Sequence, residues 1–295
     1  MTAGRAVFAG CARNCAAHLG AVLQNVELMA GLFAESAFVF VENDSADATK
    51  AMLKAWCEDR ANARVVDLDG MAQDCPIWTE RLARARNAYL EVATTAFGHY
   101  DYLFVLDMDE RNILPIDPDQ VEAAIGFLAA DGGRAGAFAN QTGAYYDMWA
   151  LRCDGWQTGD IWEEVLDLVV SAGVSDEKAF RTIFGQRIRS IAPAEAPIAV
   201  LSPFGGLGVY RMASVLANTR RHQGIKPKVL PTTDGVREMD LQTCEHVSFN
   251  AGFGDMGQSL HILPSLINGH NPNAYKLVRS SFNPSAFRGL IGKRQ

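Results

Sequence analysis

Apolar and polar positions alternate regularly over the first third of the chain. Four short apolar runs predict strands at residues 5–10, 37–42, 63–68 and 101–107. Between these runs, apolar side chains recur at helical spacing and predict helices over about 15–33, 47–60 and 77–97. This alternation indicates an α/β fold, in which a mostly parallel sheet carries helices on its faces.

The pattern is less regular further along the chain. A helix is predicted near 118–130 and a strand at 136–141, followed by an aromatic stretch, AYYDMWALRCDGWQTGDIW, that we interpret as strand, loop and helix start. A strand at 197–202 then leads into a glycine-rich turn. We expect a basic, proline-containing loop at 220–232, before CEHVSFN opens another helix. No repeat, linker or second core is visible, so one domain over 1–295 is predicted.

Composition and charge narrow the class of protein. The 295 residues are 48% hydrophobic and 21% charged, which is typical of a soluble globular protein. The net charge of −7 argues against a general nucleic-acid binder, because such a protein needs a large basic surface. A local basic pocket for a phosphorylated small molecule remains compatible with this charge.

Targeting and redox signals favour a cytoplasmic protein. The N-terminal segment is too polar for a signal peptide, and no stretch approaches the roughly 18 apolar residues of a membrane span. The six cysteines are scattered, and the C-x3-C spacing of Cys11 and Cys15 has no second pair. A zinc site is therefore disfavoured, and reduced thiols are expected.

Three carboxylates follow the strand at 101–107 within four residues: Asp107, Asp109 and Glu110. Such neighbours repel one another and are costly to desolvate. One interpretation is a solvated turn in which Asp109 or Glu110 starts a helix. The other is that Asp107 and Asp109 hold a divalent cation bridging a nucleotide diphosphate, because such cations prefer hard oxygen ligands. The clusters CARN and ENDS also follow strands, and ligands of parallel sheets gather at that edge, which favours one shared site.

Further polar residues fit a nucleotide site. Glu42 and Asp44 follow the second predicted strand, where a carboxylate can accept hydrogen bonds from a base or a ribose hydroxyl. Arg81 and Arg84, or Asn87 with Arg84, share one helix face and are suited to binding diphosphate oxygens. A solvated basic helix face is the alternative interpretation.

Glycines and aromatic residues supply two more features. Gly205, Gly206 and Gly208 allow a ligand to approach the backbone closely, but their spacing is not G-x-G-x-x-G, which disfavours a Rossmann dinucleotide site. An aromatic belt with intervening carboxylates suits the apolar and hydroxyl faces of a sugar, and core packing is the alternative. This belt comprises Tyr145, Tyr146, Asp147, Trp149, Asp154, Trp156 and Trp162.

Six segments occur in an order that resembles nucleotide-sugar glycosyltransferases with the GT-A fold. They are GCARN, FVENDSADAT, RARNAYLE, YDYLFVLDMDE, FGGLGVYR and CEHVSFN. The D-x-D element alone is weakly specific, whereas the ordered set is quite specific. The likeness is greatest to the group that includes the cryptococcal capsule-associated α-1,3-mannosyltransferases and their bacterial relatives, and it covers roughly residues 5–270.

The resemblance implies a fold, a cofactor and a donor site. The fold is a single Rossmann-like α/β/α sandwich with a mostly parallel central sheet, with a nucleotide-sugar-binding half over about 1–112, an acceptor-binding half over about 113–275 and a tail over about 276–295. Mn2+ or Mg2+ is expected at Asp107 and Asp109, with His270 preferred over His261 as third ligand. The expected nucleotide-sugar-binding residues are Ala9, Cys11, Arg13, Asn14, Glu42, Asp44, Arg81, Arg84, Asn87, Asp107, Met108, Gly205 and Gly206.

The catalytic position departs from the family pattern. Many GT-A enzymes have a Glu-Asp pair at a helix start, whereas this chain has Glu245 followed by His246. Either side chain can take the acceptor proton if its pKa is suitable. Alternatively, Glu245 complements the helix N-terminus, or a retaining enzyme needs no dedicated base and Glu245 orients the acceptor. Tyr146, Trp149 and Trp156 are the expected acceptor-binding residues.

The prediction is a metal-dependent glycosyltransferase that uses a GDP- or UDP-sugar donor and a glycan or lipid-linked acceptor in polysaccharide or glycoconjugate synthesis. Arg84 or Arg86 would help to hold the diphosphate. The alternatives are a non-catalytic nucleotide-sugar-binding relative and a sugar-phosphate nucleotidyltransferase. The latter usually has an N-terminal glycine-rich signature followed by Lys, which GCARN lacks. The apolar and basic tail also suits peripheral membrane contact, with a packed or disordered terminus as the alternative.

Overall fold

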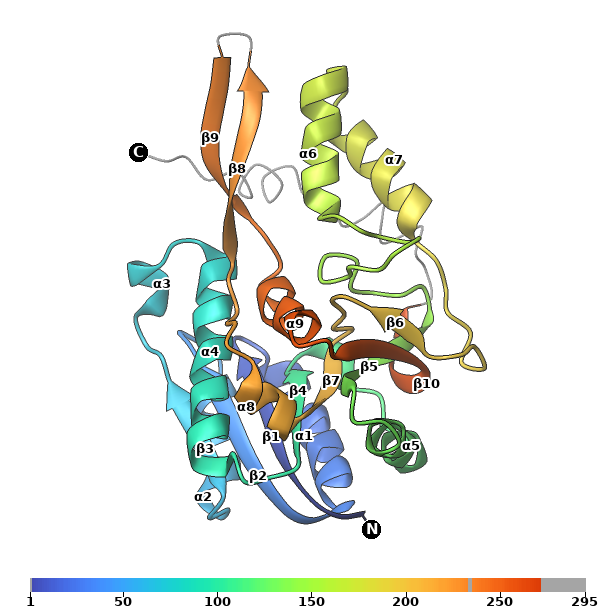
Figure 1. Ribbon diagram of the computed structural model, residues 1–295. Helices are drawn as coiled ribbons and strands as arrows, with labels where there is room; N and C mark the ends of the chain where they lie inside the picture. Colours follow the sequence, from blue (N-terminus) through green and yellow to red (C-terminus); the bar gives the residue numbers. More distant parts are fainter. Residues whose placement is uncertain (1, 233–234, 272–295) are drawn as a thin grey trace.

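The computed structural model describes residues 2–232 and 235–271 (Figure 1). Its strands are β1 (Thr2–Ala12), β2 (Phe33–Glu42), β3 (Ala63–Asp67), β4 (Tyr102–Asp107), β5 (Arg134–Gly143), β6 (Ile198–Val200), β7 (Leu207–Arg211), β8 (Ile225–Thr232), β9 (Gly235–Gln242) and β10 (Ser259–Asn271). Its helices are α1 (Ala16–Ala30), α2 (Thr49–Glu58), α3 (Met71–Asp74), α4 (Trp78–Phe97), the 3-10 helix η1 (Glu110–Asn112), α5 (Pro118–Ala129), α6 (Ile161–Ala172), α7 (Asp176–Arg187), α8 (Met212–Ala217) and α9 (His246–Asp255).

In this described part, an eight-stranded sheet runs in the order β3-β2-β1-β4-β7-β5-β10-β6. The pairs β3–β2, β2–β1, β1–β4 and β5–β10 are parallel, whereas β7 and β6 run antiparallel to their neighbours. Strands β8 and β9 form a separate hairpin that extends away from the sheet in Figure 1. The expected mostly parallel sheet is therefore confirmed.

Two apolar layers cover the two faces of the sheet. On one face, Leu19 of α1, Leu53 of α2 and Leu128 of α5 are buried in one cluster. On the other, Tyr89 of α4 and Phe249 of α9 are buried in a second cluster. The buried runs of β1 and β4 lie between these layers, which explains why they read as continuous apolar stretches. The expected α/β/α sandwich is thereby confirmed.

The predicted elements of the first half lie close to the observed ones. The helix expected over 77–97, for example, is α4 (Trp78–Phe97). Two expectations about the second half were wrong. Much of the loop expected at 220–232 is strand β8, because its backbone pairs with β9. The aromatic stretch forms no strand beyond the end of β5 at Gly143, only isolated bridges before α6.

The glycine-rich turn leads into β7, which inserts between β4 and β5. The sheet register aligns the strand ends that carry polar residues: Cys11 lies opposite Asp107, and Ala12 opposite Glu42. None of the helices in the described ranges is long and apolar enough to cross a membrane. The predicted membrane-contacting tail (276–295) lies outside the described residues.

Candidate active site

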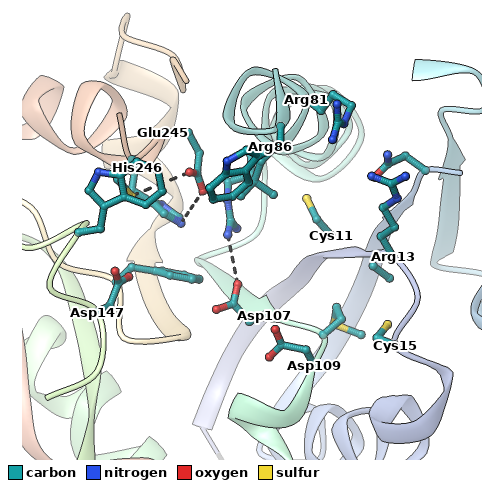
Figure 2. A pocket seen from close by; sticks show the side chains of 18 of the residues that line it. Cys11, Arg13, Cys15, Arg81, Arg86, Asp107, Asp109, Asp147, Glu245 and His246 are labelled. Carbon is teal, nitrogen blue, oxygen red and sulfur yellow. Dashed lines mark hydrogen bonds and ion pairs between the residues drawn. The ribbon is translucent and has the colours of Figure 1, made fainter. Parts of the chain in front are cut away.

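A cavity of about 360 Å³ opens where the parallel strands β1, β2 and β4 end. Figure 2 shows side chains from these strand ends facing others from α4, from the loop after β5 and from the start of α9. The cavity is lined by Cys11, Ala12, Arg13, Cys15, Asn43, Trp78, Arg81, Leu82, Arg86, Asp107, Met108, Asp109, Tyr146, Asp147, Trp149, Phe204, Cys244, Glu245 and His246. Acidic and basic side chains thus converge at the edge where parallel sheets bind ligands.

Asp107 is the last residue of β4 and is held from two sides. Its backbone N–H donates to the carbonyl of Gly206 at 2.9 Å, and its Oδ1 accepts from Nη2 of Arg86 at 3.2 Å. Burial raises the pKa of Asp107 to about 8; Arg86 opposes the shift, and Asp109 and Asp147 add to it. A carboxylate in such surroundings gains from a nearby cation.

Asp109 begins the 3-10 helix η1. Its Oδ1 accepts from the backbone N–H of Arg111 at 3.0 Å, so the helix-start interpretation holds for this residue. Burial also raises the pKa of Asp109. Met108, between the two aspartates, packs over Gly10, where an added Cβ would lie 2.6 Å from the Met108 sulfur. Glycine at position 10 therefore makes room for the aspartate loop.

Arg86 connects the two acidic parts of the site. Its side chain is buried, and its Nε donates to Oε1 of Glu245 at 2.6 Å while its Nη2 reaches Asp107. Figure 2 shows the guanidinium of Arg86 between these two carboxylates. The guanidinium also lies 4.8 Å from the ring of Phe204. Arg86 is therefore committed to carboxylates within the protein.

Glu245 and His246 stand at the start of α9, as the sequence predicted for a helix opening. Glu245 is buried and engaged by Arg86. His246 stacks on Phe204 at a ring-centroid distance of 3.9 Å, and its Nε2 lies 3.5 Å from Oε1 of Glu245. Neither ring nitrogen forms a hydrogen bond within the described residues. Burial lowers the pKa of His246 well below its usual value, and Arg86 and His222 lower it further, so this imidazole is neutral.

Two arginines line the wall of the cavity opposite His246. Arg13 follows β1 and is exposed, and Arg81 lies on α4. Nη1 of Arg81 donates to the carbonyls of Cys75 and Pro76, which fixes its direction. In Figure 2, Arg13 and Arg81 lie on the side of the cavity away from Asp147. They remain suited to an anionic ligand.

Three polar residues expected in the donor site form hydrogen bonds to the backbone of neighbouring loops. Asn14 accepts from the N–H of Ala46, and Asp44 accepts from the N–H groups of Gly70 and Ala72. Glu42 is fully buried, and its Oε1 accepts from the N–H of Ser45. None of the three lines the main cavity.

Three other expected donor-site residues also lie outside this cavity. Ala9 is buried within β1. Arg84 is exposed and pairs with Glu80, and Asn87 exchanges hydrogen bonds with the backbone of His222. Of the arginines on α4, Arg81 and Arg86 face the cavity.

The structure brings together two of the three expected acceptor aromatics. Tyr146 and Trp149 line the cavity. Trp156 does not, since it is buried and its Nε1 donates to the carbonyl of Arg187 at 2.6 Å. Trp78, which the sequence did not single out, lies at the cavity with 46% of its surface exposed and a ring-centroid distance of 5.5 Å to Trp149. A tryptophan beginning a helix that carries arginines was the available signal.

The two histidines considered as metal ligands lie on β10. His270 is inside this strand rather than in a loop, and its Nδ1 lies 2.7 Å from Oγ1 of Thr142. It lines a second, smaller hollow that shares Tyr146 with the main cavity. His261 packs against Phe127 at a ring-centroid distance of 5.1 Å, and neither histidine lines the main cavity.

Gly205 and Gly206 form the turn before β7, with φ values of +69° and +83°. The turn passes close to Asp107: a Cβ on Gly206 would lie 3.6 Å from its Oδ2. A Cβ on Gly205 would lie 2.6 Å from the backbone oxygen of Ala139. Gly205 borders the smaller hollow. Both positions therefore require glycine.

One cluster among the described residues brings three acidic or other metal-binding groups within mutual reach, namely Glu42, Asp67 and Asp69. Lys50 already lies there, with its Nζ 2.7 Å from Asp67 and 2.5 Å from Asp69. This cluster is therefore a salt-bridge network. Asp107 and Asp109 offer hard oxygens at one strand end, a donor set that fits Mn2+ or Mg2+, although His270 does not complete it in this arrangement.

No family model matches the sequence, and no curated protein matches it either. The solved structures that resemble the chain include the following three. TarS 1-349 of S. aureus has a TM-score of 0.48 at 12% identity, covering 93% of this chain and 63% of its own. The mannosyltransferase PcManGT of Pyrobaculum calidifontis, in complex with GDP-Man and Mn2+, has a TM-score of 0.49 at 15% sequence identity, and the match covers 100% of this chain and 66% of that one. Glucosyl-3-phosphoglycerate synthase of Mycobacterium tuberculosis, in complex with UDP, has a TM-score of 0.40 at 15% sequence identity, and the match covers 91% of this chain and 71% of that one.

The chain spans less than two thirds of the length of the first two of these proteins. All three TM-scores lie below 0.5.

Proposed function

We propose that this chain is a metal-dependent GT-A glycosyltransferase, which moves a sugar from a nucleotide-diphosphate sugar to a hydroxyl acceptor. One observation carries the proposal: a cavity at the carboxyl ends of β1, β2 and β4 sets the partly buried Asp107 and Asp109 against Arg13 and Arg81. A metal-bridged diphosphate has the charge pattern to match, because its cation suits carboxylates and its phosphate oxygens suit guanidinium groups.

Asp107 and Asp109 would hold the Mn2+ or Mg2+ ion. Burial has raised the pKa of both carboxyl groups, so a divalent cation there relieves an unfavourable arrangement. A bound cation would offset the negative charge that develops on the departing nucleoside diphosphate. His270 stays a predicted third ligand, on condition that the shared wall at Tyr146 shifts when the donor binds.

The other cavity residues have separate roles in this proposal. Arg13 and Arg81 bind the diphosphate, whereas Arg86 keeps Glu245 and Asp107 in place from inside the protein. Tyr146 and Trp149 face the acceptor. The same proposal includes a GDP- or UDP-sugar donor and a glycan or lipid-linked acceptor. It also includes a role in polysaccharide or glycoconjugate synthesis, a cytoplasmic location and the closer likeness to α-1,3-mannosyltransferases.

The test is a thermal-shift and transfer screen of UDP-, GDP- and CMP-sugars with Mn2+, repeated with EDTA. We expect one donor class to raise the melting temperature in a metal-dependent way and to be consumed. The double variant Asp107→Asn/Asp109→Asn should abolish both effects. Asp67→Asn/Asp69→Asn is a matched control, since it removes a second D-x-D pair, which begins at the last residue of β3 and is bound by Lys50.

Unchanged transfer by the Asp107/Asp109 variant, or full activity in EDTA, would refute the metal role. Donor binding without consumption across a broad acceptor panel would instead identify a non-catalytic nucleotide-sugar-binding protein. Release of pyrophosphate from a nucleoside triphosphate and a sugar phosphate would identify a nucleotidyltransferase.

A further inference from the structure

The loop after β5 forms one wall of the cavity. It carries Tyr146, Asp147 and Trp149, all of which line the cavity together with Asp107. Figure 2 shows Asp147 on the same side of the cavity as His246, across from Arg13. A carboxylate there lies on the side of the cavity away from Arg13 and Arg81, the two arginines that would bind the diphosphate.

Asp147 differs in its partners from the other acidic residues of the cavity. Glu245 and Asp107 are engaged by Arg86, and Asp109 caps η1. Asp147 accepts through Oδ1 from the backbone N–H of Ala150 at 3.1 Å, and no basic side chain in the described ranges forms an ion pair with it. Its carboxylate is thus fixed in direction without having its charge neutralised.

The proton affinity of this group suits proton transfer. Burial raises the pKa of Asp147 to about 6, backbone hydrogen bonds from Ala150 and Gly205 oppose the shift, and Glu245 adds to it. At pH 7 such a carboxyl is mostly ionised and is a stronger base than an ordinary aspartate. The buried, neutral His246 and the Arg86-bound Glu245 are both less suited to take a proton.

Aromatic surface adjoins Asp147 on the same wall. Trp149 contacts the half-exposed Trp78, and its Nε1 is buried without a hydrogen-bond partner among the described residues. Indole faces pack against the apolar face of a sugar ring, and a carboxylate such as that of Asp147 accepts hydrogen bonds from sugar hydroxyls. A carbohydrate is the ligand class that offers both an apolar face and a hydroxyl edge.

We propose that Asp147 is the base that activates the acceptor, and that the acceptor is a saccharide held by Trp78 and Trp149. This inference rests on the proposed glycosyltransferase function. The acceptor hydroxyl gives its proton to Oδ2 of Asp147 while its oxygen bonds to the anomeric carbon of the donor sugar. The bond from that carbon to the diphosphate oxygen breaks, and its electron pair leaves with the nucleoside diphosphate.

The experiment compares Asp147→Asn with the wild type, using the donor found in the screen and a panel of methyl hexopyranosides as acceptors. We expect kcat for transfer to fall about 10²–10⁴-fold. The donor dissociation constant, measured calorimetrically with Mn2+, should stay within about twofold. Asp154→Asn is the matched control, because Asp154 is exposed and lies outside the cavity. Trp78→Ala should raise the acceptor KM with little change in kcat.

Transfer by Asp147→Asn at the wild-type kcat would overturn the role of Asp147 and leave the proposed function intact. Loss of donor affinity in proportion to the loss of transfer would also overturn it, because Asp147 would then support the donor site. Failure of the wild-type protein to transfer from any donor would instead overturn the proposed function, and the inference with it.

Discussion

Replacing Arg86 by methionine should lower the free energy of unfolding by about 3–5 kcal/mol, the usual cost of leaving a buried charge unpaired. The Arg86 side chain is 4% exposed, and so is that of Glu245, its nearer partner. The substitution keeps much of the apolar volume but leaves Glu245 and Asp107 without a cation. The loss should therefore arise from electrostatics rather than from a cavity.

The distances indicate how large the gross attraction is. At an effective dielectric constant of about 20, charges at the 2.6 Å contact with Glu245 attract by about 6 kcal/mol. The 3.2 Å contact with Asp107 adds at most about 5 kcal/mol, and only to the extent that this carboxyl, whose pKa is raised to about 8, is ionised. Desolvation of each buried ion offsets several kcal/mol of this attraction. The net loss expected on removing Arg86 is therefore only part of the gross sum.

Urea unfolding followed by circular dichroism measures the effect. Arg84→Met is the control, because Arg84 is exposed on the same helix and should leave stability nearly unchanged. Adding Glu245→Gln to Arg86→Met should restore part of the loss, since the stranded anion is then neutral. A loss below about 1 kcal/mol for Arg86→Met would refute the reasoning, as would strict additivity in the double variant.

Burial lowers the pKa of His222 well below its usual 6.5, and the positive charge of Arg86 lowers it further. Below pH 6.5 the unfolded chain therefore binds a proton at His222 that the folded protein does not bind. The free energy of unfolding should fall as the pH falls through this range. His222→Phe should remove the contribution of this histidine to the pH dependence. Urea unfolding at pH 7.5, 6.0 and 5.0 should show the free energy of unfolding of the wild type falling by up to about 1.4 kcal/mol per pH unit relative to the variant. The same pH dependence of stability in both proteins would contradict this. Gly205→Ala should be less stable than Gly257→Ala by about 1–3 kcal/mol, because both have φ of +69° but only the Cβ at position 205 meets backbone, 2.6 Å from the oxygen of Ala139. Equal melting temperatures for the two glycine variants would contradict this, because the turn before β7 would then accommodate a Cβ without cost.

Local patterns predicted the first half of the fold well. The helix over 77–97 and the strand over 101–107 end within a residue or so of α4 and β4, because apolar spacing and turn residues are properties of the segment itself. Strand β8 was missed because Pro227 and Pro231 favour a loop in the sequence, yet a two-stranded hairpin tolerates proline where a central strand would not.

The candidate site was predictable where the strand ends determine it. Asp107 and Asp109 line the cavity because β4 ends there. Asp44 follows β2 in the same way, but its carboxylate turns back to the N–H groups of Gly70 and Ala72. The sequence does not reveal whether a loop carboxylate binds a ligand or its own backbone. Trp78 was also missed, because its place at the start of an arginine-bearing helix is a weaker signal than a run of aromatic residues.

The insertion of β7 between β4 and β5 also sets the order in which the sheet can be completed. Tyr102–Leu106 of β4 pair with a strand that the ribosome makes about a hundred residues later. At about 5–20 residues per second, the free edge of β4 waits about 5–20 s for its partner. That edge is apolar, and such an edge invites pairing with another chain. A chain that stopped before β7 would therefore leave this edge of β4 unpaired, and we expect it to aggregate more readily than the full chain.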